Sequence, residues 1–302
     1  MHLLRRMAFA APAFLLALSS ASCGLLVKSR AIVRHGKALT QGQSQTLLSA
    51  TKEDLNQRIT STYNPILSFQ ATVDMTPALG SVYKGQITEI KDVRAFVLYR
   101  KPMDIRIIGQ TPVVRTRAFD MVSNGTQFEL FLSAKNLFVQ GDNAAPATSK
   151  NKLENLRPEA FLSSMLIRPA SADEIPVLMD QTDEENAVYV LLFLKRDPAG
   201  VLIASRSVWF DRADLSIIRQ ITYDGKGEIV SDTRYAKWQT FDKILFPSHI
   251  DINRPEDGYG VAMDVMQMQM NKAFTDKDFV LDRPEGSTLQ VIGVPGATGP
   301  TK

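Results

Sequence analysis

Apolar and polar residues alternate with a period of two along much of this chain, and this alternation restricts the fold more than any other feature. In residues 68–75 the apolar positions are Phe69, Ala71, Val73 and Met75. Successive side chains of a strand point to opposite faces of a sheet, so this pattern predicts a strand with one buried face. A chain built from such segments folds mainly as β-sheet.

Similar runs recur at short intervals. They span residues 82–90, 93–101, 104–110, 119–123, 127–132, 187–195, 206–211, 216–223, 228–238, 246–253 and 259–271. Asn124-Gly125 separates two of them and predicts a type I′ hairpin turn, because both central residues of that turn need a positive φ. Asp224-Gly225 predicts a second hairpin. The spacing favours one large antiparallel sheet, sandwich or partial barrel over βαβ units.

Two short segments have the helical period instead. Thr51 and Asp54 form the pattern of a capping box, and apolar residues follow them at helical spacing. Residues 158–167 begin with proline, contain apolar pairs four residues apart and precede an Arg-Pro pair. We therefore expect one helix before the first strand and one in the middle of the chain.

The start of the chain has the pattern of an export signal. Two arginines precede an apolar run, residues 7–18, that is too short to span a bilayer, and small residues then precede Cys23. Cys23 is the only cysteine of the chain, and the segment resembles a bacterial lipoprotein signal, in which the cysteine is acylated and becomes the first mature residue. Ser20 stands where such signals usually have Leu. Plain secretion with a cut near Ala21 is the alternative.

This interpretation divides the chain into four parts. Residues 1–22 are a signal peptide, residues 23–45 a tether, residues 46–292 one folded domain, and residues 293–302 a disordered tail. The formal charge of +3 includes two arginines of the signal, so the mature chain carries about +1 and offers no argument for nucleic-acid binding. Since no apolar run of spanning length follows Cys23, membrane contact is expected from the lipid anchor or from surface patches.

The sequence contains no motif for catalysis or metal binding. Its three histidines, His2, His35 and His249, are far apart, and one cysteine cannot complete a zinc site. No serine lies in a nucleophile-elbow motif. Asp173-Glu174 and Asp183-Glu184-Glu185 lie in loop-like sequence, where solvated charge is expected and glycoside chemistry is the alternative. We therefore expect a protein that is not an enzyme and has no cofactor and no metal.

Several short motifs occur in a fixed order along residues 46–292. They are Phe69-Gln70-Ala71-Thr72, Arg100-Lys101-Pro102, Ile105-Arg106, Asn124 to Phe128, Asn136-Leu137-Phe138, Tyr235 to Gln239, Phe246 to Ile250, Phe279-Val280-Leu281 and Pro284-Glu285-Gly286. Together with the central helix they resemble the LolA/LolB-like superfamily of periplasmic lipoprotein carriers. Lys243 departs from the pattern, because the superfamily often has a turn glycine there, and this affects only that turn.

The resemblance implies a single curved antiparallel sheet, an unclosed β-barrel, with helices covering its concave face. In the superfamily that face is a hydrophobic cavity for acyl chains. The candidate lining residues here are Phe69, Val73, Val97, Ile107, Phe128, Leu130, Met263 and Val265 from the strands, and Phe161 and Met165 from the central helix. An ordinary core role is the alternative for each of them.

The last long run of the sequence, residues 259–271, changes its alternation part of the way along. Met266, Met268 and Met270 have the opposite parity from Met263 and Val265. This change predicts a bulge or a switch of the buried face.

The expected function is that of a membrane-anchored envelope lipoprotein. It would bind acyl chains of lipids or lipoproteins and take part in their transport to the outer membrane, where we expect it to face the periplasm. Lipidated Cys23 favours a fixed receptor over a diffusing carrier, and a periplasmic carrier protein is then a partner. The alternative is an interaction module that senses the state of the envelope. An open apolar cavity would favour the first function, and a tightly filled concave face the second.

Overall fold

The computed structural model describes residues 46–81, 86–89, 93–145 and 156–293, all of which belong to one compact unit. The predicted signal, Cys23 and tether lie outside the described residues, as does nearly all of the predicted tail. The described residues form the helices α1 (Lys52–Tyr63) and α2 (Pro158–Met165). The strands are β1 (Ser68–Ser81), β2 (Gln86–Glu89), β3 (Val93–Arg100), β4 (Asp104–Gln110), β5 (Arg117–Ser123), β6 (Gln127–Leu132), β7 (Leu137–Asp142), β8 (Ile175–Asp180), β9 (Val188–Arg196), β10 (Leu202–Asp211), β11 (Ile217–Tyr223), β12 (Ile229–Phe241), β13 (Ile244–Arg254), β14 (Tyr259–Met270) and β15 (Thr288–Ile292).

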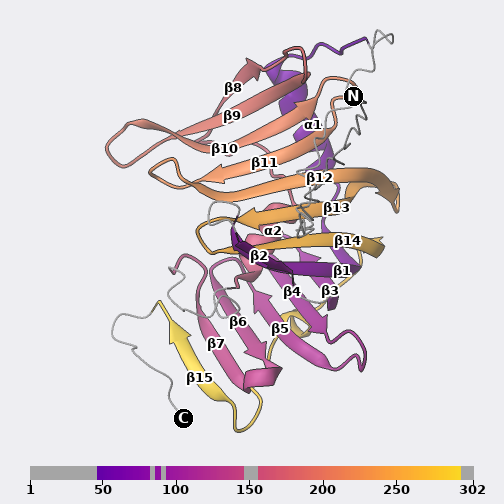
Figure 1. The fold of residues 1–302 in the computed structure, drawn as a ribbon, viewed down its shortest axis with the longest axis vertical. Coiled ribbons are helices and arrows are strands. Elements are labelled where there is room, and N and C mark those ends of the chain that lie inside the picture. Colours follow the sequence, from indigo (N-terminus) through magenta and orange to yellow (C-terminus); the bar gives the residue numbers. More distant parts are fainter. Residues whose placement is uncertain (1–45, 82–85, 90–92, 146–155, 294–302) are drawn as a thin grey trace, which may run out of the picture. The chain divides into compact units, whose positions relative to one another are not determined.

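All strands among the described residues belong to one sheet (Figure 1). Its order is β15-β7-β6-β5-β4-β3-β1-β14-β13-β12-β11-β10-β9-β8, and β2 pairs with β1 beside this path. The end strands β15 and β8 do not pair with each other, so the sheet is open. This confirms the prediction of one large unclosed sheet.

Both helices pack on the same face of the sheet, which we call the inner face. Helix α1 packs against β8 and β13, and α2 packs against β4, β5 and β13. In a flat sheet β5 and β13 would lie about 24 Å apart, because neighbouring strands are about 4.8 Å apart, and one helix could not contact both. The sheet therefore curves around α2, and the helices cover the concave side as predicted.

Helix α1 begins and ends where the sequence predicts. The Thr51 hydroxyl accepts the backbone N–H of Asp54 at 3.2 Å, and the Asp54 carboxylate accepts the backbone N–H of Thr51 at 2.9 Å. This capping box satisfies two donors that the first turn cannot. Leu55 and Ile59, one turn apart, are fully buried in the core.

The predicted bulge in the last long run is confirmed. In the pairing of β1 with β14, Thr72 lies opposite Gln267 and Val73 lies opposite Val265, so Met266 is the extra residue. Its side chain is 54% exposed. The bulge returns Met268 and Met270 to the inner face, where both are buried.

Both predicted hairpins form, but the predicted turn type is wrong. At the first turn only Gly125 has a positive φ, and the Asn124 side chain accepts the backbone N–H groups of Thr126 and Gln127. At the second turn Gly227, not Gly225, has the positive φ. A side chain that accepts backbone N–H groups can hold a longer loop, so a two-residue type I′ turn is not needed.

One pairing departs from the predicted antiparallel sheet, because β15 runs parallel to β7. Residues 271–287, which we call the strap, cross the outer face of the sheet from the end of β14 to the start of β7. Arg106 donates to the carbonyl oxygen of Asp278, and Leu281 packs with Phe131 and Phe138. The strap ends beside the first residue of β7, and β15 continues from there in the same direction as β7.

No helix among the described residues combines the length and the apolar character needed to cross a membrane. Strands β7, β8 and β15 have no counterpart among the predicted runs. Each is a short strand near an end of the sheet, where the alternation is too brief to be distinctive.

Candidate functional site

The ten candidate lining residues all lie in one buried core on the inner face. They come from β1, β3, β4, β6, β14 and α2, and they are Phe69, Val73, Val97, Ile107, Phe128, Leu130, Phe161, Met165, Met263 and Val265. None is more than 7% exposed. The structure thus brings together side chains that are far apart in the sequence. Their role as the lining of a ligand cavity stays a prediction.

The side chains of this interior pack against one another. The ring of Phe69 lies 5.2 Å from that of Tyr99 and 5.8 Å from that of Phe246, centroid to centroid. The two helices add Leu55, Ile59 and their neighbours to the same core. In this conformation the interior is closed, so a ligand would have to displace one of the elements that fill it.

Helix α2 is held in the interior by two different kinds of contact. Phe161, Leu162 and Met165 belong to the apolar core. On the side of β11 and β12, Tyr235 donates its hydroxyl to the carbonyl oxygen of Ser164 at 2.8 Å, and Gln220 donates its amide to that of Ser163 at 3.0 Å. The last carbonyls of a helix have no partner within it, so these two side chains satisfy groups that α2 leaves free.

The segment between α2 and β8 is attached to the inner face through a buried carboxylate. Glu174 accepts two hydrogen bonds from Arg168, at 2.8 and 2.9 Å, and two from Arg206, at 3.0 and 3.1 Å. The Glu174 side chain is only 1% exposed. The prediction that Asp173-Glu174 is solvated loop charge is therefore wrong for Glu174. Sequence spacing could not show this, because Arg206 lies 32 residues from Glu174 and is brought close by the pairing of β8, β9 and β10.

The electrostatics of this group are those of a buried, strongly paired ion. Burial raises the pKa of Glu174, but hydrogen bonds from Arg206 and Arg168 outweigh it and hold the pKa well below its usual range. Burial lowers the pKa of Arg206, against the effect of Glu174. The Arg206 guanidinium also lies over the ring of Phe193, 3.7 Å from its centroid. Glu174 is therefore ionised in the folded protein at neutral pH.

A second group of buried charges lies at the other end of α2. The guanidinium of Arg157, the residue before the helix, lies 4.3 Å from the centroid of the Phe128 ring, and burial lowers its pKa. Burial raises the pKa of Glu159, with Arg254 acting against it. It also raises the pKa of Tyr259 to about 12. Polar groups therefore lie at both ends of the short helix that fills the apolar interior.

A pocket of about 350 Å³ lies between the strap and strands β5, β6, β7 and β15, at the border of the interior, because Phe128 and Ile292 of the core also line it. Its lining includes Phe279 of the strap and the outer-face residues Val122, Glu129 and Gln140. Burial raises the pKa of Glu129, and nearby Asp282 adds to this. The lining is mixed in polarity, so this pocket does not resemble a site for acyl chains.

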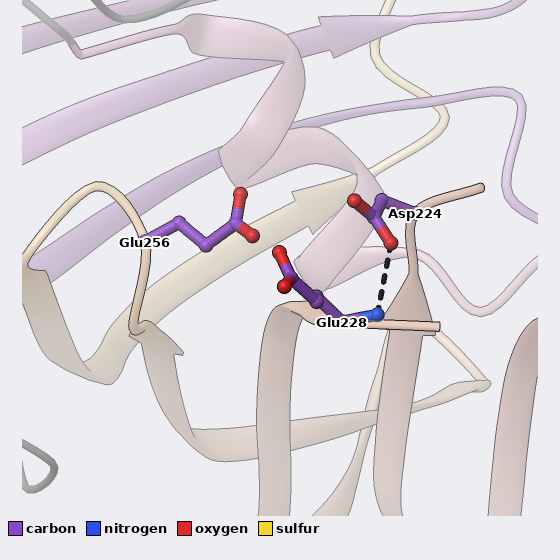
Figure 2. Close-up of side chains that lie close together, drawn as sticks. All are labelled: Asp224, Glu228 and Glu256. Atoms are coloured by element: carbon purple, nitrogen blue, oxygen red, sulfur yellow. Dashed lines mark hydrogen bonds between the residues drawn. The ribbon is translucent and has the colours of Figure 1, made fainter. Parts of the chain in front are cut away.

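Three carboxylates meet at the hairpins that join β11 to β12 and β13 to β14 (Figure 2). Oxygen atoms of Asp224, Glu228 and Glu256 lie within 4.8 Å of one another. Asp224 accepts the backbone N–H groups of Lys226 and Glu228, and a hydrogen bond shared with Glu228 raises the pKa of Glu256. Both glutamates are exposed. Asp224 thus stabilises the turn, and these surface carboxylates do not form a defined binding site.

The remaining polar residues considered in the sequence have structural roles. Asp183 accepts the backbone N–H groups of Glu185 and Asn186 in a turn. His249 lies on the outer face between Asp264, at 2.7 Å, and Asp251, at 3.2 Å. Among the described residues, no contact brings a serine or cysteine side chain to Asp183 or His249.

Comparisons with known proteins agree with this architecture. No family model and no curated protein matches the chain. Among solved structures it is similar to a LolA superfamily protein from Nitrosomonas europaea, with a TM-score of 0.50 and 15% identity over 77% of this chain and 99% of that one. A putative outer membrane lipoprotein-sorting protein domain from Vibrio parahaemolyticus gives a TM-score of 0.48 and 14% identity over 76% and 97%. A DUF1329 family protein from Desulfovibrio piger gives a TM-score of 0.48 and 14% identity over 76% and 95%. The chain therefore has a fold similar to that of the LolA superfamily protein from Nitrosomonas europaea, in agreement with the fold that its sequence motifs predict.

Proposed function

We propose that this protein is a non-enzymatic envelope lipoprotein that binds acyl chains of lipids or lipoproteins on the inner face of its sheet. The observation that carries this proposal is the continuous apolar core of a LolA-type sheet, into which one short helix, α2, is inserted. The similar fold of the LolA superfamily protein from Nitrosomonas europaea supports it. In this view the closed structure is the form without ligand.

Binding would require α2 to leave part of the interior. The helix has eight residues and is joined to β11 and β12 by a few hydrogen bonds that water can replace. Each methylene of a ligand that takes its place contributes about 0.8 kcal/mol on leaving water. An acyl chain could thus offset the loss of the contacts made by Phe161, Leu162 and Met165.

The hairpin between β4 and β5 supports contact with a membrane surface. Val113 and Val114 at its tip are 89% and 74% exposed. Arg115 and Arg117 follow them, and both arginines are exposed. Apolar side chains flanked by cations suit a surface of anionic lipids. A membrane protein that transfers acyl chains needs such a contact, because the chains must not cross water.

Anchoring through lipidated Cys23 belongs to the same proposal. An acylated cysteine with more than one chain holds a protein stably on a membrane. A protein fixed in this way would act as a receptor in the outer membrane, facing the periplasm, and would take its cargo from a periplasmic carrier protein.

The direct test is the identity of co-purified molecules. The domain exported behind a cleavable signal without a lipidated cysteine, in place of residues 1–23, then purified from the envelope fraction and extracted for mass spectrometry, should yield lipid or acylated peptide. The matched control is Met268→Glu, which places a charge in the apolar interior and should abolish co-purification. Repeated absence of acyl compounds from the unmodified domain would contradict the proposal.

One observation favours the second candidate, an interaction module that senses the envelope. The interior is filled by the protein's own side chains, and the outer face of β8, β9 and β10 exposes apolar residues. Ile175 is 47%, Val177 38% and Leu202 45% exposed. If this module is the true function, Val177→Asp would remove binding of a protein partner, and no acyl compound would be found in the domain.

A further inference from the structure

We propose that Arg168 and Arg206 form a binding site for the anionic headgroup, a phosphate or a carboxylate, of an amphiphilic ligand, and that Glu174 occupies this site in the closed protein. The inference rests on the proposed function and adds to it the chemistry of the headgroup. It treats the Glu174 carboxylate as an internal ligand that the true ligand replaces.

The first argument is the number of donors directed at one carboxylate. Besides the four guanidinium N–H contacts, the backbone N–H of Ser171 lies 3.1 Å from one oxygen and the Ser205 hydroxyl 2.9 Å from the other. Two guanidinium groups, a hydroxyl and a backbone N–H are the donors that proteins use to bind phosphate and carboxylate groups. The site is thus a complete anion site that a side chain of the protein fills.

The second argument is that the Glu174 carboxylate does not satisfy every hydrogen-bond donor of this site. Nη1 of Arg206 is buried and has no hydrogen-bond partner among the residues that the structure describes, and the Arg206 side chain is only 3% exposed. Two arginines face the Glu174 carboxylate, and the exposed Asp173 carboxylate also interacts with Arg168, so the inference rests on the unsatisfied nitrogen and not on net charge. A buried charged donor without a partner is costly, and a phosphate, which has more oxygen atoms than a carboxylate, could satisfy it.

A second buried carboxylate, Asp120, also faces two arginines, Arg106 and Arg117, so what distinguishes the Glu174 group is the guanidinium nitrogen that its carboxylate leaves unsatisfied. On the outer face Arg106 also binds a buried carboxylate, Asp120, through two hydrogen bonds of 2.8 and 3.0 Å. There Nη1 of Arg106 donates to the carbonyl oxygen of Asp278, so each nitrogen of that guanidinium has a partner. The Arg106–Asp120 pair is therefore a structural ion pair of the same type and serves as a matched control.

The third argument is the position of the site at the border of the apolar interior. Leu166 and Ile167, which lead from α2 to Arg168, are buried in the core, and Phe193 lies directly beneath Arg206. The Arg168 side chain is 48% exposed. A headgroup held here would lie at the protein surface with its chains directed into the core, which is the arrangement that an amphiphile requires.

The fourth argument is the connection to α2. Glu174 is the residue before β8, and the segment that it anchors begins at the end of α2. Arg206 also donates to the carbonyl oxygen of Pro169 in this segment, at 3.1 Å. An anion that displaces Glu174 would release the segment and with it the end of α2. Recognition of the headgroup would thus open the interior to the chains.

The test compares two probes with the same acyl chains, dihexanoyl phosphatidic acid and uncharged dihexanoylglycerol, with inorganic phosphate as a third. We expect the domain to bind the phosphatidic acid more tightly than the glycerol lipid. Arg206→Gln and Arg168→Gln should weaken phosphatidic acid binding by roughly tenfold or more, since each removes charge-assisted hydrogen bonds, and should leave dihexanoylglycerol binding nearly unchanged. Equal losses for both lipids, or no loss, would overturn the site.

Glu174→Gln should tighten phosphatidic acid binding, because it removes the charge of the internal competitor, and Asp120→Asn should lower stability without changing the preference between the two lipids. Unchanged binding in Glu174→Gln would overturn the role of Glu174 as an internal ligand. If Glu174→Gln does not fold, the same question is answered by Glu174→Asp, whose shorter carboxylate should also compete less well. Equal affinity for inorganic phosphate and phosphatidic acid would show a site for a free anion and overturn the headgroup assignment.

The failure of this inference differs from the failure of the proposed function. If neither lipid binds but phosphate raises the melting temperature of Glu174→Gln and not of Asp120→Asn, the anion site exists and acyl-chain binding is wrong. If both lipids bind with the same affinity in every arginine variant, acyl-chain binding stands and the headgroup site is wrong.

Discussion

The Tyr235 hydroxyl donates a hydrogen bond of 2.8 Å to the carbonyl oxygen of Ser164 and so joins β12 to the last turn of α2. Tyr235 is fully buried, and burial raises the pKa of its hydroxyl far above the usual value. It therefore stays a neutral donor at any pH at which the protein is folded. This hydrogen bond is one of the few polar contacts that hold α2 in the interior.

We expect Tyr235→Phe to loosen α2 without unfolding the sheet. The change leaves a buried carbonyl oxygen without its donor, which costs about 1–2 kcal/mol. Hydrogen exchange of the amides in residues 158–167 should become faster, and lipid uptake should become faster with it. Tyr223→Phe, which removes a hydroxyl 3.3 Å from that of Ser207, is the control. Equal exchange of α2 in both variants would show that Tyr235 does not restrain the helix.

Cys23→Ser should move the protein from the membrane fraction to the soluble envelope fraction, since a serine cannot carry the thioether-linked lipid. Fractionation followed by immunoblotting measures this. Ser20→Leu is the control, because it supplies the leucine usual in lipoprotein signals and should leave the protein in the membrane. Membrane retention of Cys23→Ser would mean that the attachment has another origin.

The exposed valines of the β4–β5 hairpin give a prediction about membrane contact. We expect Val113→Ser combined with Val114→Ser to weaken binding of the domain to vesicles by about tenfold or more, because a buried valine side chain contributes roughly 1.5 kcal/mol. Vesicles of phosphatidylcholine with phosphatidylglycerol, sedimented with the protein, provide the measurement. The control changes Val201 and Leu202, which are 58% and 45% exposed in another hairpin. If the control weakens binding as much, the contact is not specific to the first hairpin.

The group around His249 gives a prediction about pH. A hydrogen bond to Asp251 raises the pKa of His249, burial acts against this, and Asp264 raises the pKa further. The folded protein therefore holds this proton more tightly than the unfolded chain. The resulting stability is fully present below about pH 6.5, the unfolded value, and is lost as the pH rises through the higher folded value.

The measurements are an NMR titration of His249 and urea unfolding at a series of pH values, from below about 6.5 to above the pKa of His249 in the folded protein. Asp264→Asn should lower the pKa of His249 and reduce the decline of stability with rising pH. The Lys237 ammonium lies 3.7 Å from the Asp264 carboxylate. Lys237→Gln is the control, and in this variant the stability should still decline with rising pH. A His249 pKa that does not fall in Asp264→Asn would refute this account.

The bulge in β14 separates two methionines that the sequence alone does not distinguish. Met268→Glu should lower the free energy of unfolding by about 3 kcal/mol or more, because it buries a carboxylate in the apolar interior. Met266→Glu should change it by no more than about 0.5 kcal/mol, because that side chain is 54% exposed. Chemical denaturation of both variants measures the difference. Similar losses in both would place the bulge elsewhere.

The sequence was informative wherever the structure depends on local periodicity. The capping box of α1, the helix opened by Pro158 and the parity change near Met266 are all local patterns, and each was found where predicted. The turn at Asn124-Gly125 was predicted in place but not in type, because the Asn124 side chain holds the backbone in a way that the dipeptide alone does not reveal.

The ion pairs and the strand directions were beyond the sequence for a common reason. Glu174 lies six residues from Arg168 but 32 from Arg206, and the pairing of β8, β9 and β10 brings the second arginine to it. The parallel direction of β15 depends on the path of the strap across the outer face. Such contacts are set by the distance between segments in space, which residue spacing does not contain.

By itself the sequence determined that this chain consists mainly of strands with two short helices, because alternation and capping act over a few residues. The single open sheet was predicted only by the resemblance to LolA/LolB-like carriers, and the structure confirms it. Only the tertiary structure decided that the interior is closed by α2, which polar groups hold that helix, and that Glu174 is a buried ion rather than loop charge. Burial and pairing depend on which residues the strand order and the packing of α2 bring together, and a carboxylate has the same local sequence whether it faces water or two arginines.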